Sequence, residues 1–351
     1  MGRKITAVII SLAMVVAMSA CSARAEKRYK ASFLNLFDTV TEIVGYAESK
    51  EQFTQYSQTI YDYLDEYNRL YDIYHNYEGL NNLKTINDNA GVKPVKVDRK
   101  IIELLMFSKK MYELTDRNVN IAMGSVLSLW HEHRVAGLEE PMIATLPDYK
   151  ELQSRAEHTN INKILIDEKA STVFLEDREM SLDVGAIAKG YAVEQTALAV
   201  EKASFVNGMI SVGGNIRTLG SKFNEKGSTA PWSVGIQNPD SDSEEKTLHI
   251  LNLTECSLVT SGIYERYYIV NDRQYHHIID PKTLMPAEYF VFVSIVCRDS
   301  GMADALSTAV FNMPFEQGLK FIEGLDGVEA MWEFHDGTKQ YSSGFKSLIK
   351  E

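Results

Sequence analysis

The sequence predicts an α+β fold, because helical and strand-like segments are mixed without the strict alternation of a doubly wound sheet. Two amphipathic helices dominate the first third of the chain, and strand-like segments dominate after residue 160. The chain contains no repeat of solenoid period and no low-complexity tract. Its 351 residues are enough for one large domain or for two interleaved lobes.

The N-terminal segment has the composition of a secretory signal. Arg3 and Lys4 precede an apolar run over 5–18, and a small-residue site ends in Cys21. This order resembles a bacterial lipobox, in which Cys21 is lipidated and becomes the new N-terminus; a plain signal peptide with a chance cysteine is the alternative. We expect residues 1–20 to be removed, 21–31 to form a tether, and 32–351 to form a domain anchored by lipid outside the cytoplasmic membrane.

The charge of the chain argues against two kinds of partner. The net charge is −12, and removal of residues 1–20 takes away Arg3 and Lys4 and no acid, which leaves −14. An acidic chain without a basic cluster argues against nucleic acid and against electrostatic attachment to anionic lipid. Cys256 and Cys297 either form one disulfide or remain buried thiols in strand-like runs.

The periodicity predicts the elements in chain order. Residues 33–46 alternate as a strand pair, and apolar and tyrosine side chains three and four residues apart predict a helix over 50–74. An Asn- and Gly-rich loop over 76–91 precedes a helix over 98–115 that Asp98 caps. The later expectations are strands at KILID, TVFLE, FVNGMISVG, WSVGIQNP, TLHILNL and VFVSIVC, helices over 186–203, 301–312 and 314–325, and hairpins at Asn271-Asp272 and Asp336-Gly337.

One turn, SLDVGAIAKG (181–190), combines Asp183, two glycines and Lys189 at the start of a helix. Glycine allows another backbone or a ligand to come close, and the free N–H groups of a helix N-terminus suit a phosphate. The glycine register fits neither the dinucleotide fingerprint nor the P-loop. Taken alone, the segment is either a phosphate-binding turn or an ordinary strand-to-helix connection.

Three further segments hold most of the remaining polar chemistry. They are ISVGGNIRTLG (210–220), TSGIYERYY with YHHIIDPKT (260–283), and MADALSTAVFNM (302–313). In the last one, Asp304 and Thr308 are one helical turn apart and present a carboxylate and a hydroxyl on the same face. Hard oxygen ligands of this kind suit Mg²⁺, although an isolated Asp304 also reads as an acid near a helix N-terminus. Ser307 lies beside this face and could assist through water.

The four segments together resemble the FAD:protein FMN transferase family, the ApbE-type flavin transferases, from about Phe33 to Ser343. The departures from the family pattern are FDT (37–39) in place of a Met-Gly-Thr turn, Asn120 in place of Asp, and Ala186 in place of a frequent second glycine. The resemblance implies a mixed fold with interleaved α/β lobes around a flavin-nucleotide cleft.

The resemblance also implies the roles of individual residues. Asp304, Thr308 and the backbone carbonyl of Ala186 would hold Mg²⁺, and Lys189 would neutralise pyrophosphate charge. Asp183 would accept hydrogen bonds from the flavin nucleotide. Five other residues would line the FAD pocket: Phe37, Tyr74, Ala122, Met123 and Ile279. Tyr74 also fits as a core residue at the end of its helix.

The adjacent histidines must differ in role, because neighbours on a strand point to opposite faces. His277 aligns with the family's His-Ile-Ile-Asp-Pro segment, and an imidazole can take a proton from an attacking hydroxyl near neutral pH. His276 is then structural or exposed, and Asp280 caps the turn at Pro281.

The resulting hypothesis is an Mg²⁺-dependent, cell-surface enzyme that moves FMN from FAD to a Thr or Ser hydroxyl of a partner protein and releases AMP. Its acceptor would be a flavoprotein of respiratory or extracellular electron transfer. One alternative is an FAD pyrophosphatase that uses water at the same site, and another is a lipid-anchored flavin-binding protein without chemistry. The released product distinguishes the three.

Overall fold

The computed structural model describes residues 26–223, 227–240 and 242–351. The predicted signal segment and Cys21 therefore lie outside the described residues. Within the described ranges, no helix is both long enough and apolar enough to cross a membrane. The first strand already begins at Lys27, so the predicted tether over 21–31 is too long: residues 27–31 pair with 43–47 because their side chains alternate as a strand edge requires.

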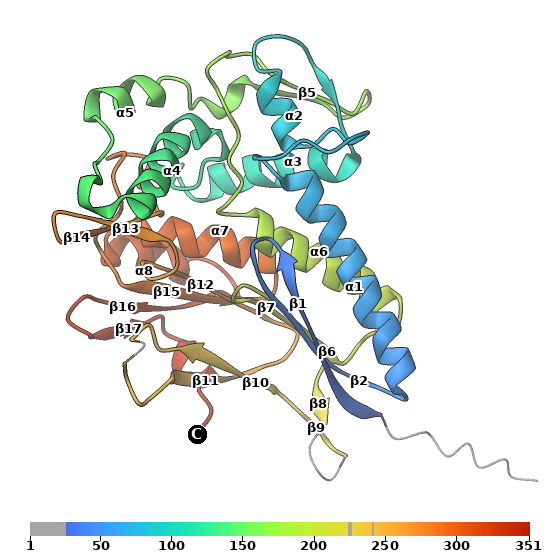
Figure 1. Cartoon of the computed structure of the whole chain (residues 1–351). Helices are drawn as coiled ribbons and strands as arrows, with labels where there is room; N and C mark the ends of the chain where they lie inside the picture. Colours follow the sequence, from blue (N-terminus) through green and yellow to red (C-terminus); the bar gives the residue numbers. More distant parts are fainter. Residues whose placement is uncertain (1–25, 224–226, 241) are drawn as a thin grey trace, which may run out of the picture.

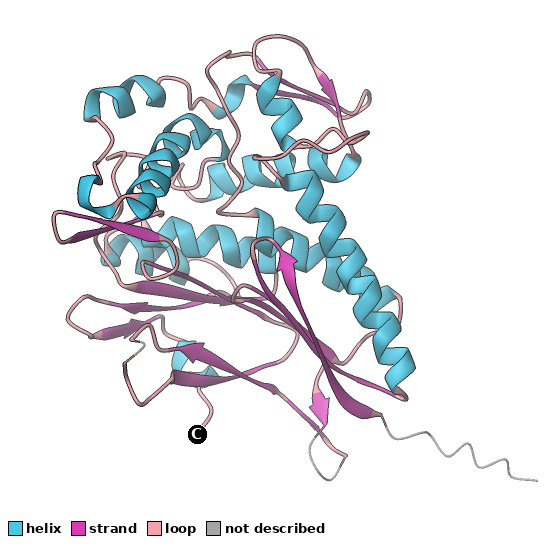
Figure 2. Cartoon of the chain, viewed as in Figure 1, coloured by secondary structure: helices cyan, strands magenta, loops and turns pink. Residues whose placement is uncertain are grey.

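An antiparallel sheet of eight strands forms the base of the molecule (Figures 1 and 2). Every pairing in it is antiparallel, and the spatial order is β1-β2-β6-β7-β12-β15-β16-β17. The strands are β1 (Lys27–Leu36), β2 (Thr39–Ala47), β6 (Gly208–Val212), β7 (Asn215–Leu219), β12 (Ser257–Gly262), β15 (Phe292–Cys297), β16 (Glu329–Glu333) and β17 (Lys339–Tyr341).

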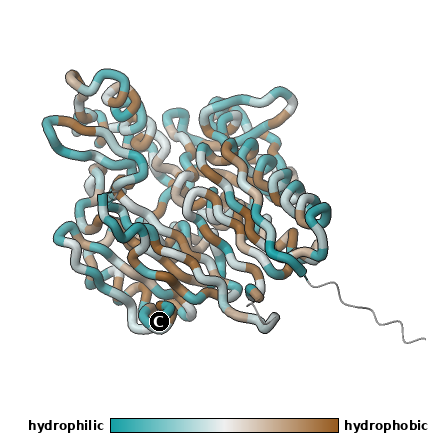
Figure 3. Tube along the Cα trace, turned by 60° about the horizontal axis from the view of Figure 1, so that its bottom comes forward, coloured by the Kyte–Doolittle hydropathy of each residue, from teal (hydrophilic) through white to brown (hydrophobic). Residues whose placement is uncertain are grey.

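Helices cover one face of this sheet and a strand pair covers the other (Figure 1). β15 is buried at every position because both of its faces are covered. Figure 3 shows hydrophobic residues along the strands and hydrophilic residues in the outer loops. The helices are α1 (Lys50–Tyr71), α6 (Ala188–Lys202), α7 (Ser300–Phe311) and α8 (Phe315–Glu323), and the strands are β10 (Trp232–Gln237) and β11 (Thr247–Leu253).

A second lobe lies above the helical layer and is built from the middle of the chain (Figure 1). Its hairpin β13–β14 comes from a later segment and packs on α4, so the two lobes are interleaved along the sequence. The elements are α2 (Leu83–Asp88), β3 (Val95–Lys96), α3 (Arg99–Leu114), α4 (Gly124–Glu139), α5 (Tyr149–Ala156), β4 (Ile164–Asp167), β5 (Thr172–Leu175), β13 (Tyr267–Val270) and β14 (Arg273–His276). Two short strands complete the described fold, β8 (Lys222–Phe223) and β9 (Thr229–Ala230).

The α+β prediction is confirmed, and most predicted elements agree to within three residues. Asp98 caps α3, and Asn271 and Asp272 form a two-residue hairpin turn in which both have positive φ. The loop expected over 76–91 was wrong in part, because Asn82 caps the short helix α2 with its side chain. Helices α4 and α5 were not predicted; the apolar residues of α4 form no clear stripe, because it packs against several elements at once.

Both cysteines within the described residues are free thiols, Cys297 buried and Cys256 partly buried. Of the two predicted alternatives, free thiols are therefore confirmed and a disulfide is not formed. Burial raises the pKa of both thiols, which keeps them protonated at neutral pH and makes them structural residues.

Candidate active site

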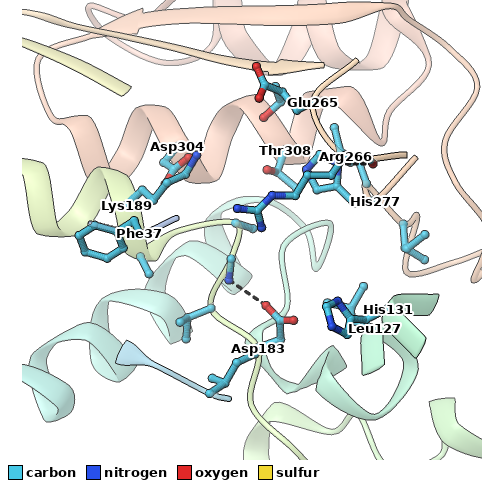
Figure 4. A pocket seen from close by; sticks show the side chains of 18 of the residues that line it. Phe37, Leu127, His131, Asp183, Lys189, Glu265, Arg266, His277, Asp304 and Thr308 are labelled. Carbon is cyan, nitrogen blue, oxygen red and sulfur yellow. Dashed lines mark hydrogen bonds between the residues drawn. The ribbon is translucent and has the colours of Figure 1, made fainter. Parts of the chain in front are cut away.

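A cavity of about 650 Å³ separates the two lobes, a size typical of small-molecule sites. It brings together residues from all four polar segments that the sequence singles out, and Figure 4 labels members of three of them. Of the predicted site residues in the described ranges, all but one line it: Phe37, Tyr74, Met123, Asp183, Ala186, Lys189, His277, Ile279, Asp304 and Thr308.

The exception is Ala122, which is fully buried in the main core. It belongs to the one-turn helix Ile121–Met123, whose N-terminus is capped by the side chain of Asn120. The carbonyl of Ile121 accepts a hydrogen bond from the Asp183 N–H at 2.9 Å. Ala122 therefore lies beside the cavity floor while its side chain points into the core.

The wall formed by α6 and α7, here called the sheet-side wall, comprises Ala186, Lys189, Asp304 and Thr308. Asp304 is only 5% exposed, and its Oδ2 accepts a hydrogen bond from the Gly190 N–H at 2.8 Å. Burial raises the pKa of Asp304, while the Lys189 charge and the Gly190 N–H oppose that shift. Figure 4 shows Lys189 next to Asp304. The wall thus holds a buried carboxylate that a cation would stabilise.

Two features keep this wall tightly packed. A Cβ on Gly190 would lie 2.2 Å from the Ser300 carbonyl oxygen and 2.5 Å from the Asp304 Cβ, so only glycine lets α6 and α7 approach this closely. The Ser307 hydroxyl donates to the Asp304 carbonyl at 2.9 Å, bonds to the Ser261 hydroxyl at 2.8 Å and is fully buried. Ser307 therefore supports the helix from inside and does not line the cavity.

The opposite wall, here called the hairpin-side wall, comprises His131, Arg134, Arg266 and His277. His277 directly follows β14, and its Nδ1 lies 3.2 Å from the Arg266 carbonyl oxygen. Because a carbonyl only accepts, Nδ1 carries the proton and Nε2 is the free acceptor. The imidazole faces the open cavity but has protein around its other sides; this burial, with the charge of Arg266, lowers the pKa of His277 to about 3.

The neighbouring His276 has the structural role that was predicted as one of its alternatives. It is 7% exposed; its Nε2 donates to the Ala287 carbonyl at 2.8 Å and its Nδ1 accepts from the Ile278 N–H at 3.2 Å. Burial lowers the pKa of His276. Asp280 accepts from the Lys282 N–H at 2.8 Å, so it caps the turn as expected.

Asp183 lies on the cavity floor between the walls. Its Oδ1 accepts from the Gly185 N–H at 2.8 Å (Figure 4). Burial raises its pKa, and the Gly185 N–H, His131, Arg266 and Arg134 oppose the shift. The turn SLDVGAIAKG thus delivers Asp183 to the floor and Lys189 to the sheet-side wall, and it carries the chain from one lobe to the other.

Phe37 reaches the cavity from the two-residue turn between β1 and β2. Phe37 and Asp38 have φ of 52° and 53°, a left-handed conformation that costs a non-glycine residue roughly 1–2 kcal/mol. The Asn68 side chain accepts from the Phe37 N–H at 3.0 Å and holds this turn. Tyr74 is 52% exposed, and its ring lies 5.3 Å from that of His131. It is therefore a cavity residue rather than a core one.

Three residues that the sequence did not predict also line the cavity: His131, Arg134 and Arg266. Arg134 donates to the Nδ1 of His131 at 2.9 Å. The signal for His131 and Arg134 was their spacing of three residues, but it has meaning only once α4 is known to be helical. Arg266 lay inside a motif that was singled out, yet nothing in the sequence gives the direction of its side chain.

Comparisons with known proteins agree with this geometry. The model of the ApbE family matches residues 37–332. A protein of Treponema pallidum named FAD:protein FMN transferase is 32% identical, over 76% of this chain and 75% of its own. A protein of that name from Klebsiella pneumoniae is 29% identical, over 70% and 73%.

Solved structures of this kind share the fold. The crystal structure of the ApbE protein of Thermotoga maritima superposes with a TM-score of 0.79 at 27% identity, covering 93% of this chain and all of the other. The flavin transferase ApbE of Vibrio cholerae gives a TM-score of 0.74 at 24% identity, over 92% and 99%. The predicted mixed fold around a cleft is thereby confirmed.

Proposed function

Since the chain belongs to the ApbE family, we propose that it transfers FMN from FAD to a Thr or Ser hydroxyl of a partner flavoprotein and releases AMP. Two relatives named FAD:protein FMN transferase match this chain over about three quarters of their own length. The observation that carries the proposal is one cavity in which a buried carboxylate, a lysine and a neutral histidine meet from separate segments.

Mg²⁺ fits the sheet-side wall. The lining of the whole cavity carries five carboxylates against three Lys and Arg cations, a formal charge of −2 with neutral histidines, so a dianionic pyrophosphate needs an added cation in this cavity. On the sheet-side wall, Asp304 supplies a buried carboxylate for that cation. No cluster of three His, Cys, Asp or Glu side chains that could hold a metal exists in the described ranges. Asp304, Thr308 and the Ala186 carbonyl would therefore share the ion with substrate oxygens, which is how Mg²⁺ is usually held. When bound, it would offset charge on the phosphate oxygens.

His277 supplies the base. Its Nε2 accepts the proton of the attacking hydroxyl, whose oxygen forms a bond to the FMN phosphorus. The bond from this phosphorus to the bridging oxygen breaks, and AMP leaves with that oxygen and its electron pair. Lys189 stabilises the charge on the pyrophosphate side. The hydrogen bond from Nδ1 to the Arg266 carbonyl keeps the imidazole in the required tautomer.

The remaining predicted residues position FAD. Asp183 accepts hydrogen bonds from the nucleotide, and Phe37 and Tyr74 offer aromatic surface to its rings. Met123 and Ile279 add apolar surface, and Ala122 supports the floor from behind. These assignments place the donor between the two walls, with its phosphates toward Lys189.

Lipid anchoring through Cys21 is part of the proposal, because an anchored enzyme outside the cytoplasmic membrane can meet the flavoproteins of electron transfer. Its support is the order of charged, apolar and small residues before Cys21. Cys21→Ser should release the protein from the membrane fraction or leave it unprocessed. A mature wild-type N-terminus at another residue, without lipid, would contradict the anchor.

The reaction is tested with the chain from residue 22, FAD, Mg²⁺ and a purified Thr-bearing domain of a membrane flavoprotein. We expect AMP and covalently fluorescent acceptor in equal amounts, both stopped by chelation of Mg²⁺. Replacing the acceptor Thr with Val should stop the labelling. AMP with free FMN, whether or not acceptor is present, would identify the pyrophosphatase instead. FAD that binds and stays intact beside a competent acceptor would leave only a binding protein.

A further inference from the structure

Arg266 lines the cavity. It ends the segment between β12 and β13, and its side chain reaches toward the middle of the space, between Thr308 and Asp183 (Figure 4). Among the described residues, no ion pair or side-chain hydrogen bond to its guanidinium is present. By contrast, Arg217 pairs with Glu194 in the interior, and Arg273, in strand β14 of the hairpin that Arg266 leads into, pairs with Glu288. A guanidinium has five N–H donors in a planar fork, and here that fork faces the cavity.

A second arginine on the hairpin-side wall, Arg134, makes the binding of an anion beside Arg266 more favourable. Within the described ranges, the side chain of Arg134 bonds only the neutral ring of His131. Burial lowers the pKa of Arg134, and the charge of Arg266 lowers it further. Two neighbouring cations that repel one another in a half-buried site would both be stabilised by a bound anion. Asp183, the carboxylate on the floor, acts on both of them but forms an ion pair of bonding distance with neither.

The backbone of Arg266 links this cation to the base. Its carbonyl oxygen holds the Nδ1–H of His277, while β13 and β14 pair Tyr267 with His276 immediately beside them. Arg266 and His277 therefore face each other across the open end of one hairpin, directly before β13 and directly after β14. Both side chains line the cavity, and the charge of Arg266 acts on the His277 ring, so an anion bound by the guanidinium would lie on the same side of the cavity as the imidazole.

We propose that Arg266 is a further catalytic residue, whose guanidinium binds the non-bridging oxygens of the FMN phosphoryl group during transfer. This inference rests on the proposed function. As the acceptor oxygen bonds to phosphorus and AMP departs, charge grows on these oxygens, and a planar fork matches them with two parallel hydrogen bonds. Lys189 on the opposite wall then serves the leaving side, so the two cations divide the pyrophosphate between them.

Ligand binding separates this role from a structural one. We compare the affinities of FMN and riboflavin, which differ by the phosphate, from their flavin fluorescence in the presence of Mg²⁺. Arg266→Ala should weaken FMN binding by about 10-fold or more, the scale of a charged hydrogen bond, and leave riboflavin unchanged. Arg273→Ala, on the same hairpin, should change neither. Equal losses for both flavins, or no loss for FMN, would overturn the inference.

Turnover gives the second readout. Arg266→Ala should lower kcat for AMP release by about 10²-fold or more, as for a lost oxyanion donor, and Arg266→Lys should recover only part of it because it lacks the fork. Added guanidinium should partly restore Arg266→Ala and not Arg266→Lys. If Arg266→Ala does not fold, Arg266→Gln replaces it. A wild-type protein without AMP release refutes the proposed function, whereas an active wild type with unaffected variants refutes only the role of Arg266.

Discussion

The two walls of the cavity pack on different hydrophobic clusters. The sheet-side wall belongs to α6 and α7, which pack on the eight-stranded sheet and share its large core. The hairpin-side wall belongs to α4 and a hairpin that pack on a smaller separate cluster, around Trp130, Tyr268 and Leu284. Asp304 is buried and bonded to a neighbouring helix, whereas the guanidinium of Arg266 faces open space.

Under the proposed function, this contrast would match the two kinds of chemistry in the cavity. The sheet-side wall would hold Mg²⁺, whose strict geometry needs ligands fixed by rigid packing. The hairpin-side wall would supply positive charge and accept a proton through side chains that meet their partners only when the substrate binds. The sheet-side wall should therefore respond to packing changes, and the hairpin-side wall to changes of charge.

The largest effect is expected at Asp304. Asp304→Asn keeps the size of the side chain and an oxygen that can accept from the Gly190 N–H, but it removes the charge. AMP release should fall by about 10³-fold, while the melting temperature stays close to that of the wild type. Asp304→Ala should lose both turnover and stability. An active Asp304→Asn variant with normal Mg²⁺ dependence would contradict the metal assignment.

The adjacent histidines test the hairpin-side wall. His277→Ala should lower kcat by about 10²-fold or more, the scale of a lost general base, without loss of stability. His276→Ala should leave kcat nearly unchanged but lower the free energy of unfolding by roughly 1–3 kcal/mol, because it leaves buried backbone groups unpaired. Urea unfolding and AMP release separate the two outcomes. Equal kinetic losses would mean that the strand faces are misassigned.

Gly190 tests whether tight helix contact supports the sheet-side wall. A methyl group there meets the Ser300 carbonyl and the Asp304 Cβ, so Gly190→Ala should lower the free energy of unfolding by about 2–3 kcal/mol. Gly318→Ala in α8 is the matched control, since its Cβ would have 3.5 Å to the nearest atom and a helix gains from alanine. Equal stability of the two variants would show that α6 and α7 have room to separate.

The protonation of His277 should depend on Arg266. The protein around the ring lowers its pKa to about 3, with the charges of Arg266, His276 and Arg134 acting in the same direction. The ring is neutral above its pKa and gains a proton as the pH falls through it. NMR of labelled histidine should therefore show no titration of His277 between pH 8 and 5. Arg266→Ala removes a like charge and should raise that pKa; a wild-type ring that titrates near 6.5 would contradict the burial.

The smallest effect is expected at Thr308. Thr308→Val keeps the shape and removes the hydroxyl, which should raise the Mg²⁺ concentration for half-maximal rate by about fivefold, the scale of one neutral polar contact of roughly 1 kcal/mol. Thr308→Ser retains the hydroxyl and should resemble the wild type. The measurement is AMP release against Mg²⁺ concentration, and an unchanged curve for Thr308→Val would remove Thr308 from the ligand set.

The sequence by itself determined whatever depends on neighbours along the chain. The spacing of Asp304 and Thr308 places them on one helix face, and strand alternation separates His276 from His277, because both follow from fixed backbone periodicity. The hairpin at Asn271-Asp272 and the cap at Asp98 are equally local. Helix and strand propensities alone predict only the α+β class. The mixed fold with a cleft between lobes was predicted from the resemblance of four segments to one family.

Only the tertiary structure decided what depends on contacts between distant segments. Two examples are the Arg266 guanidinium, which has no ion-pair or side-chain hydrogen-bond partner among the described residues, and Arg134, which reaches the cavity on an unpredicted helix; both require knowledge of how the elements around the cavity pack. The need for glycine at 190 likewise comes from the approach of α7, more than a hundred residues later in the chain. Side-chain direction and burial are set by packing, which no local pattern encodes.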